Sequence, residues 1–171
     1  MGTLNFAGGA GFSGTGTNSI STGAKLIKTA QPAFSVWLDG SQSIAHQTDT
    51  RVNFNREEFD VGGGYDHTTN YRFTAPVAGK YLFMGHLYIY FSFQVEAKIY
   101  KNGSIYKRFS GPLGSGGNDN PNGIDFMDII HLDVGEYVEI YARQIRTGDT
   151  NTQNIYGGNT KETSFVGYFL G

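Results

Sequence analysis

The chain has 171 residues, a formal net charge of −2 and no cysteine. This length predicts one domain with a normal buried core, and the lack of cysteine excludes a disulfide scaffold and thiolate metal sites. The charge argues against nucleic acid or an anionic membrane as a partner, and the most apolar run, Tyr81 to Phe93, is shorter than the roughly 20 residues that span a bilayer.

Residues 1–30 differ in composition from the rest of the chain. They are mainly Gly, Ser, Thr and Ala, with isolated apolar side chains at Phe6, Phe12, Leu26 and Ile27. Such a segment is too poor in apolar residues to form a core, so we expect a flexible docking arm, followed by a domain over residues 31–171. The start of the chain also lacks the basic and apolar regions of a leader, so we expect no secretory signal.

Two glycine patterns in the arm match known motifs only formally. Gly9 to Gly14 has the spacing of a dinucleotide-binding fingerprint, which must follow a buried strand and open a helix; neither pattern flanks it here. Gly8, Gly11 and Gly14 also have the three-residue spacing of collagen, but the period fails at Thr17 and the stretch has no proline. We therefore keep the interpretation of a docking arm.

The remaining sequence predicts strands throughout. Pro32–Trp37 and Thr50–Asn55 alternate apolar and polar residues, which predicts two strands on either side of a polar, turn-rich segment at 39–49. The run Gly62-Gly63-Gly64 allows a positive φ or a close backbone approach. Ala75-Pro76 ends a strand, because proline cannot donate to the ladder.

From Gly79 onward, runs rich in Tyr, Phe, Val and Ile are separated by clusters of Gly, Asn and Asp, as in a β-sandwich or barrel. Asn102-Gly103 predicts a two-residue hairpin, since both turn positions must tolerate positive φ. Within Tyr137–Arg143, Val138, Ile140 and Ala142 alternate with polar and aromatic residues, so one face of this strand is expected to be core.

Several short motifs follow one another in a characteristic order. They are Phe34 with Val36, Val52 with Phe54-Asn55, Asp60 with Gly63 or Gly64 and Tyr65-Asp66, Phe73 to Phe83, Ala97 with Ile99 to Gly103, Leu132 with Gly135 to Ile140, and Phe165 with Gly167 and Phe169-Leu170. This order resembles the globular head of complement C1q, whose fold is similar to that of tumour necrosis factor, over residues 32–170. Asn70 stands where the family commonly has Gly; because Asn also tolerates the left-handed region, we expect this turn to survive.

The resemblance implies an all-β, antiparallel jelly-roll sandwich that assembles as a homotrimer and binds other molecules. Tyr81–Phe93 and Ser164–Leu170 are apolar on both faces, so one face would pack on the other sheet and the second on neighbouring subunits. We expect the subunit interface to draw on the aromatic residues Tyr71, Phe73, Tyr141, Phe165 and Phe169. For each of them the alternative is a place in the sandwich core, and the sequence leaves open which strand face meets the threefold axis.

Catalytic chemistry is not indicated. His46, His67, His86 and His131 lack metal-ligand spacing, and no G-x-S-x-G nucleophile elbow is present. The acidic pairs Glu57-Glu58 and Asp125/Asp128 have no identifiable partner group. We therefore expect that the protein is not an enzyme and carries no cofactor, with calcium as the one ion to consider.

The segment Asn118–Gly123 is similar to a calcium loop, but Ile129 stands where the bidentate Glu of an EF-hand would be. Some C1q heads bind calcium near the trimer apex, so the resemblance makes Asp119 and Asp125 candidate ligands. The alternative is a solvated turn.

C1q-like modules also occur on phages and other viruses, at fibre tips or as trimeric knobs on the capsid. By this analogy we expect a non-enzymatic virion surface protein, a trimeric capsid decoration or short-fibre knob whose arm binds a capsid or tail protein, with an adhesion role toward a cell-surface glycan or protein receptor. Two alternatives are the receptor-binding tip of a phage tail fibre and a soluble, extracellular C1q-like lectin or adhesin of a cell.

Overall fold

The computed structural model describes residues 31–90, 94–111, 122–145 and 150–171. The arm of residues 1–30, with Phe6, Phe12, Leu26 and Ile27, and the calcium candidate Asp119 lie outside these described residues. The described residues form strands joined by turns and loops. In this part of the chain, no helix has the length and apolar character needed to span a membrane.

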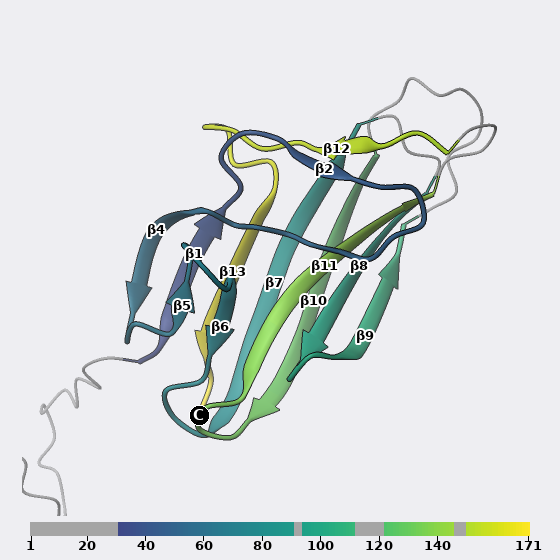
Figure 1. Ribbon diagram of the computed structural model, residues 1–171. Helices are drawn as coiled ribbons and strands as arrows, with labels where there is room; N and C mark the ends of the chain where they lie inside the picture. The colour runs from purple at the N-terminus through teal and green to yellow at the C-terminus, as the bar shows by residue number, and fades with distance from the viewer. Residues whose placement is uncertain (1–30, 91–93, 112–121, 146–149) are drawn as a thin grey trace, which may run out of the picture.

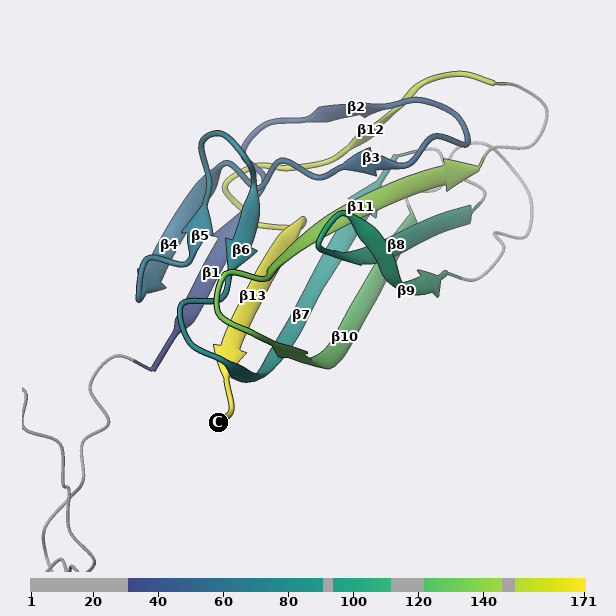
Figure 2. The same cartoon turned by 60° about the horizontal axis from the view of Figure 1, so that its bottom comes forward.

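Two antiparallel sheets pack face to face, as Figure 1 and Figure 2 show. Across sheet 1 the order is β4-β1-β13-β7-β10, and the short β12 and β2 continue from the far end of β7. Its strands are β1 (Ala33–Trp37), β2 (Gln42–Ile44), β4 (Arg56–Val61), β7 (Gly79–Ile89), β10 (Asn122–Leu132), β12 (Gln153–Ile155) and β13 (Ser164–Phe169).

Sheet 2 has the order β5-β6-β11-β8-β9, and β3 pairs with β11 beyond the end of β6. Its strands are β3 (Thr50–Arg51), β5 (Tyr65–Asp66), β6 (Arg72–Thr74), β8 (Gln94–Lys101), β9 (Ser104–Ser110) and β11 (Tyr137–Ile145). The expected all-β sandwich is therefore confirmed.

The core lies between the sheets and is dominated by aromatic rings. Phe34 of β1 packs against Phe165 of β13 with 5.0 Å between ring centroids, and against Phe73 of β6 at the same distance. Val138, Ile140 and Ala142 of β11 are buried, as their alternation predicted. Burial of aromatic side chains at this density is the main stabilising contribution expected for such a sandwich.

The hairpin turn predicted at Asn102-Gly103 and the close approach predicted within Gly62-Gly63-Gly64 are both confirmed. Asn102 and Gly103 have φ of 51° and 77°, which joins β8 to β9 in a two-residue hairpin. Gly64 needs a hydrogen in place of a side chain, because a Cβ there would lie 2.5 Å from the ring of Phe73. In the turn before β6, Tyr71 takes the left-handed conformation, with φ of 48°, where we had expected Asn70 to do so.

The predicted strand Thr50–Asn55 is wrong in its length. Only Thr50–Arg51 pairs as a strand, because β3 and β6 share one edge of β11 and each finds few partners there. Val52 and Phe54 are nevertheless fully buried, so the alternation correctly indicated which side chains point inward. The charged strand β4, which the sequence did not predict, pairs with β1 at the edge of sheet 1.

Candidate functional site

The outer surface of sheet 1 carries two adjacent rows of mainly apolar residues that run across five strands. The strand register places Phe59, Ser35, Val166, Met84 and Met127 in one row, and Val61, Ala33, Tyr168, Leu82 and Ile129 in the next. We call these two rows the apolar face. With neighbouring strands about 4.8 Å apart, four inter-strand spacings make it about 19 Å wide.

Side chains of the apolar face are unusually open to solvent for their size. Met127 is 61% exposed, Ile129 53% and Tyr168 49%. Phe59, Val61 and Met84 are also exposed, on β4 and β7. Single apolar residues on a surface are ordinary, but a contiguous patch bordered by polar groups is typical of a protein interaction site.

Polar residues border the apolar face on both sides. On one side, His86 of β7 faces Asp125 of β10, and His86 Nδ1 lies 2.7 Å from Asp125 Oδ1. On the other side, Lys80 pairs in register with His131. A depression of about 590 Å³ lies beside the His86–Asp125 pair and is lined by Met84, Met127, Ser164 and Val166 among others.

Three of the five expected interface residues lie inside the protomer instead. Phe73 and Phe165 are 1% exposed and Phe169 6%, and all three pack on other core rings. On β13, Phe165 and Phe169 point inward because they alternate with the outward residues Val166 and Tyr168, and Phe73 is the buried residue of β6. The expectation is corrected accordingly: the second apolar surface of β13 belongs to Val166 and Tyr168.

Tyr141 lies on the outer surface of sheet 2, where it belongs to a largely buried cluster of polar side chains. Its ring stacks on Tyr100 with 4.0 Å between centroids. The Tyr100 hydroxyl donates to Asp49, 3.0 Å away, and burial together with this bond raises the pKa of Tyr100 to about 12. Asp49 also pairs with Lys98, which is 1% exposed and lies 3.3 Å from a Glu96 oxygen.

A buried lysine without partners would be strongly destabilising, so this set of carboxylates supports the fold at that point. Tyr71, the fifth candidate, directly precedes β6 and lies under the guanidinium of Arg51, 5.4 Å from its ring centroid. Tyr71 and Tyr141 therefore lie away from the apolar face.

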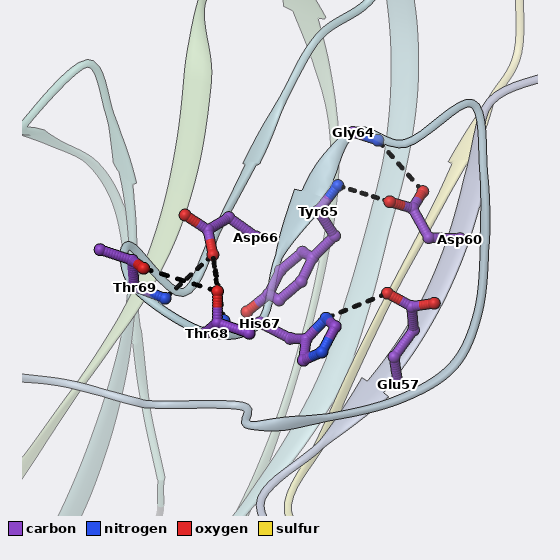
Figure 3. A network of polar contacts seen from close by, with 8 residues as sticks. All are labelled: Glu57, Asp60, Gly64, Tyr65, Asp66, His67, Thr68 and Thr69. Carbon is purple, nitrogen blue, oxygen red and sulfur yellow. Dashed lines mark hydrogen bonds and ion pairs between the residues drawn. The ribbon is translucent and has the colours of Figure 1, made fainter.

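The segment that resembles the family motif D-x-x-G-x-Y-D organises a loop between the two sheets, as Figure 3 shows. Asp60 accepts hydrogen bonds from the backbone N–H groups of Gly64 and Tyr65, at 3.2 and 2.8 Å. Asp66 accepts from the N–H groups of Thr69, Thr68 and Asn70, at 2.9, 3.0 and 3.1 Å, and these bonds hold its pKa well below the usual range. Both carboxylates thus have structural roles.

Asp125, the calcium candidate that the structure describes, lies on β10 and faces His86. Among the described residues, no group of three or more acidic, His or Cys side chains could hold a metal ion. With Asp119 outside the described part, calcium binding through this pair stays a prediction.

Sequence reasoning missed the residues of the apolar face, although it found their strands with the exception of β4. The available signal was alternation: in Ser164–Leu170 the residues of the family motif, Phe165, Gly167 and Phe169, share one parity. Since a motif shared for its fold marks the core, the opposite parity of Val166 and Tyr168 is the one left for partners.

Comparison with known proteins identifies the fold but no family. No protein-family model and no curated protein matches the sequence. Among solved structures, the globular domain of zebrafish complement 1qA matches with a TM-score of 0.56 and 18% identity over 82% of this chain and 98% of that one.

Two members of the tumour necrosis factor family are similar to the same extent. Murine APRIL matches with a TM-score of 0.60 and 13% identity, over 82% of this chain and 99% of that chain. Eiger TNF from S. frugiperda matches with a TM-score of 0.58 and 12% identity, over 82% of this chain and 91% of that chain. The chain therefore has the C1q/TNF-like jelly-roll fold.

Proposed function

We propose that this protein is a non-enzymatic binding module that works as a homotrimer, with the apolar face buried between subunits. The observation that carries the proposal is the apolar face itself, whose exposed side chains lie on four of its five strands: Phe59, Val61, Met84, Met127, Ile129 and Tyr168. Its polar border matches the anatomy of a subunit interface. The C1q and TNF families, which share the fold, form trimers and support this choice of stoichiometry.

Threefold symmetry requires a second surface on each chain. In a closed ring of three copies, the contact is heterologous, so the apolar face of one subunit meets a different surface of the next. Ile105 and Tyr106 of the edge strand β9 are each 50% exposed and offer such a surface. Side chains near the threefold axis would instead contact the same residues of the other two subunits.

The setting we propose for this trimer is a virion surface, where it serves as a capsid decoration or short-fibre knob. Residues 1–30 support this, because a Gly, Ser and Thr-rich arm with isolated Phe and Leu side chains suits docking on a carrier particle. The trimer would then present the opposite end of the sandwich to the surroundings.

The trimer is tested by static light scattering of the full chain at micromolar concentration. We expect about three times the mass of one 18.7 kDa chain, and a monomer mass at that concentration would refute the assembly. The setting is tested by locating the protein on purified virions with a specific antibody. Labelling of the capsid supports the decoration role, whereas labelling of a tail tip indicates a receptor-binding fibre, and absence from any virion leaves a cellular adhesin.

A further inference from the structure

A second concave site lies at the rim of the sandwich, away from the apolar face. It has a volume of about 330 Å³ and is formed by the β1–β2 loop, the segment before β4 and the turn before β6. Its lining includes Asp39, Ser41, Gln42, Asn53, Asn55 and Tyr71. This volume is at the lower end of the range of about 300–1,000 Å³ for small-molecule sites.

Two amide side chains in this site are held rigidly by the backbone. Asn55 Oδ1 accepts from the N–H of Asp39 at 2.7 Å, while its Nδ2 donates to the Asp39 carbonyl at 3.2 Å. Gln42 Oε1 accepts from the N–H of Asn53 at 2.9 Å, and its Nε2 donates to the Arg51 carbonyl at 2.6 Å. In each residue, one contact uses an acceptor position of the amide oxygen and the other uses a hydrogen of the amide nitrogen.

An amide has two acceptor positions and two donor hydrogens. Asn55 and Gln42 therefore each retain one acceptor position and one donor hydrogen, held in a fixed orientation. Both partners of Asn55, the N–H and the carbonyl of Asp39, lie along the edge where the amide oxygen and nitrogen are adjacent, so the remaining acceptor and donor point away from each other and can each bond a separate hydroxyl of a ligand. A sugar, whose hydroxyls both donate and accept, offers such groups at several positions. Because the amides are already oriented, little side-chain entropy is lost when the ligand binds.

Tyr71 contributes an aromatic ring in an uncommon backbone conformation. Its φ of 48° is rare for a large aromatic residue and indicates a position that the surrounding structure enforces. The guanidinium of Arg51 lies over the ring, 5.4 Å from its centroid, and restrains it. An amphipathic ring at the edge of a polar site can pack on the C–H face of a sugar while its hydroxyl stays hydrated.

The charges at this site favour a neutral ligand. Asp39 is the charged residue of the lining, and its Oδ2 lies 2.8 Å from Nε of Arg56. Arg51, beside Tyr71, lies 3.4 Å from Glu139. No Lys or Arg is among the described lining residues, and the two guanidinium groups beside the site are already paired with Asp39 and Glu139.

From these observations we propose that this rim site binds a neutral saccharide of one or two sugar units. Asn55, Gln42 and Asn53 would bind its hydroxyls and Tyr71 would pack on its ring. The proposal does not rest on the trimer, since all these residues belong to one chain. If the trimer does form, three copies of the site would bind a glycan-coated surface more tightly than one copy binds a free sugar.

The test uses saturation-transfer NMR and titration of the full chain with methyl glycosides of galactose, glucose, mannose, fucose, N-acetylglucosamine and N-acetylgalactosamine, with N-acetylneuraminic acid as the anionic probe. We expect millimolar binding of at least one neutral glycoside and none of the anionic sugar. Absence of binding to every neutral glycoside at tens of millimolar would overturn the proposal, as would preferential binding of the anionic sugar.

Two variants locate the binding. Tyr71→Asn removes the ring but keeps a residue that tolerates positive φ, and Asn53→Ala removes a side chain from another wall of the site. Each is expected to weaken binding about tenfold or more, whereas Val134→Ala, which shortens an exposed side chain in the turn between β10 and β11, is expected to leave it unchanged. Unaltered affinity in both site variants would overturn the proposal.

Light scattering of the same samples separates this proposal from the trimer. If the protein is a monomer and binds a glycoside, the trimer is refuted and the rim site is supported. If it is a trimer and binds no glycoside, the trimer is supported and the rim site is refuted. If Tyr71→Asn failed to fold, Asn53→Ala alone would decide.

Discussion

A glutamate at Met127 provides a sharp test of the apolar face. Met127 lies at the β10 end of one apolar row and is 61% exposed in the single chain. The substitution therefore costs little within the protomer, where the new carboxylate stays in water. In the proposed trimer the same position is buried against a neighbouring subunit. The cost of burying the new carboxylate then arises at three equivalent positions around the axis.

The magnitude follows from the exposed fraction. Complete burial of a Met side chain contributes about 1.5–3 kcal/mol, so burial of the 61% that is exposed contributes about 1–2 kcal/mol per subunit and about 3–6 kcal/mol per trimer. A buried, unpaired carboxylate adds a penalty of several kcal/mol at each position. Each 1.4 kcal/mol changes the association constant about tenfold, so micromolar Met127→Glu is expected to be monomeric.

Sedimentation velocity of the wild type, Met127→Glu and the control Val134→Glu measures this directly. Val134 is 67% exposed in the turn between β10 and β11, outside the apolar face, and its variant should sediment like the wild type. Circular dichroism should give the folded β spectrum for all three proteins. A folded Met127→Glu that remains trimeric at micromolar concentration would refute our assignment of this face to the subunit interface.

Three further predictions follow from the described contacts and from the arm. Phe169→Ala should lower the free energy of unfolding by roughly 3–5 kcal/mol, because it empties a buried aromatic site, whereas Asp125→Ala should change it by less than about 0.5 kcal/mol. Thermal melts of both variants and the wild type, with and without a chelator, measure these effects. If Asp125→Ala melted earlier than Phe169→Ala, and the chelator lowered the melting temperature of the wild type in the same way, a calcium-bridged apex would be indicated instead. Deletion of residues 1–30 should leave the trimer mass and melting temperature intact but abolish attachment to the carrier particle in a co-sedimentation assay; unfolding of the truncated trimer would contradict the docking role. The ion pair of Glu136 with Lys101 and its bond from the N–H of Asp133 lower the pKa of Glu136 from 4.5 to about 2, so its contribution to stability is complete above pH 4.5 and disappears as the pH falls toward 2. Urea unfolding between these pH values should show a smaller loss of stability in Glu136→Gln than in the wild type, and an equal loss in both would contradict it.

Local sequence patterns determined those features that depend on neighbouring residues. The hairpin at Asn102-Gly103 was predictable because two adjacent residues tolerate positive φ. The inward face of Tyr137–Arg143 follows from its period of two. The motif order from residue 32 to 170 also predicted the jelly roll correctly, and solved structures with this fold match the chain over 82% of its length.

The tertiary structure decided what depends on pairing between distant strands. Thr50–Asn55 shortens to a two-residue strand because β6 occupies the remaining edge of β11, and the charged segment Arg56–Val61 becomes a strand because β1 offers it an edge. Pattern alone cannot reveal either, since hydrogen-bonding edges exist only once the sheets are assembled.

The candidate sites divide in the same way. Composition and alternation determined that β13 has two apolar faces, yet only the packing of Phe165 and Phe169 against rings from other strands assigns one face to the core and leaves Val166 and Tyr168 to a partner. The rim site joins Gln42, Asn55 and Tyr71 from three separate segments, and no spacing in the sequence signals their meeting. Local preferences act over a few residues, whereas a surface is the product of which distant strands lie side by side.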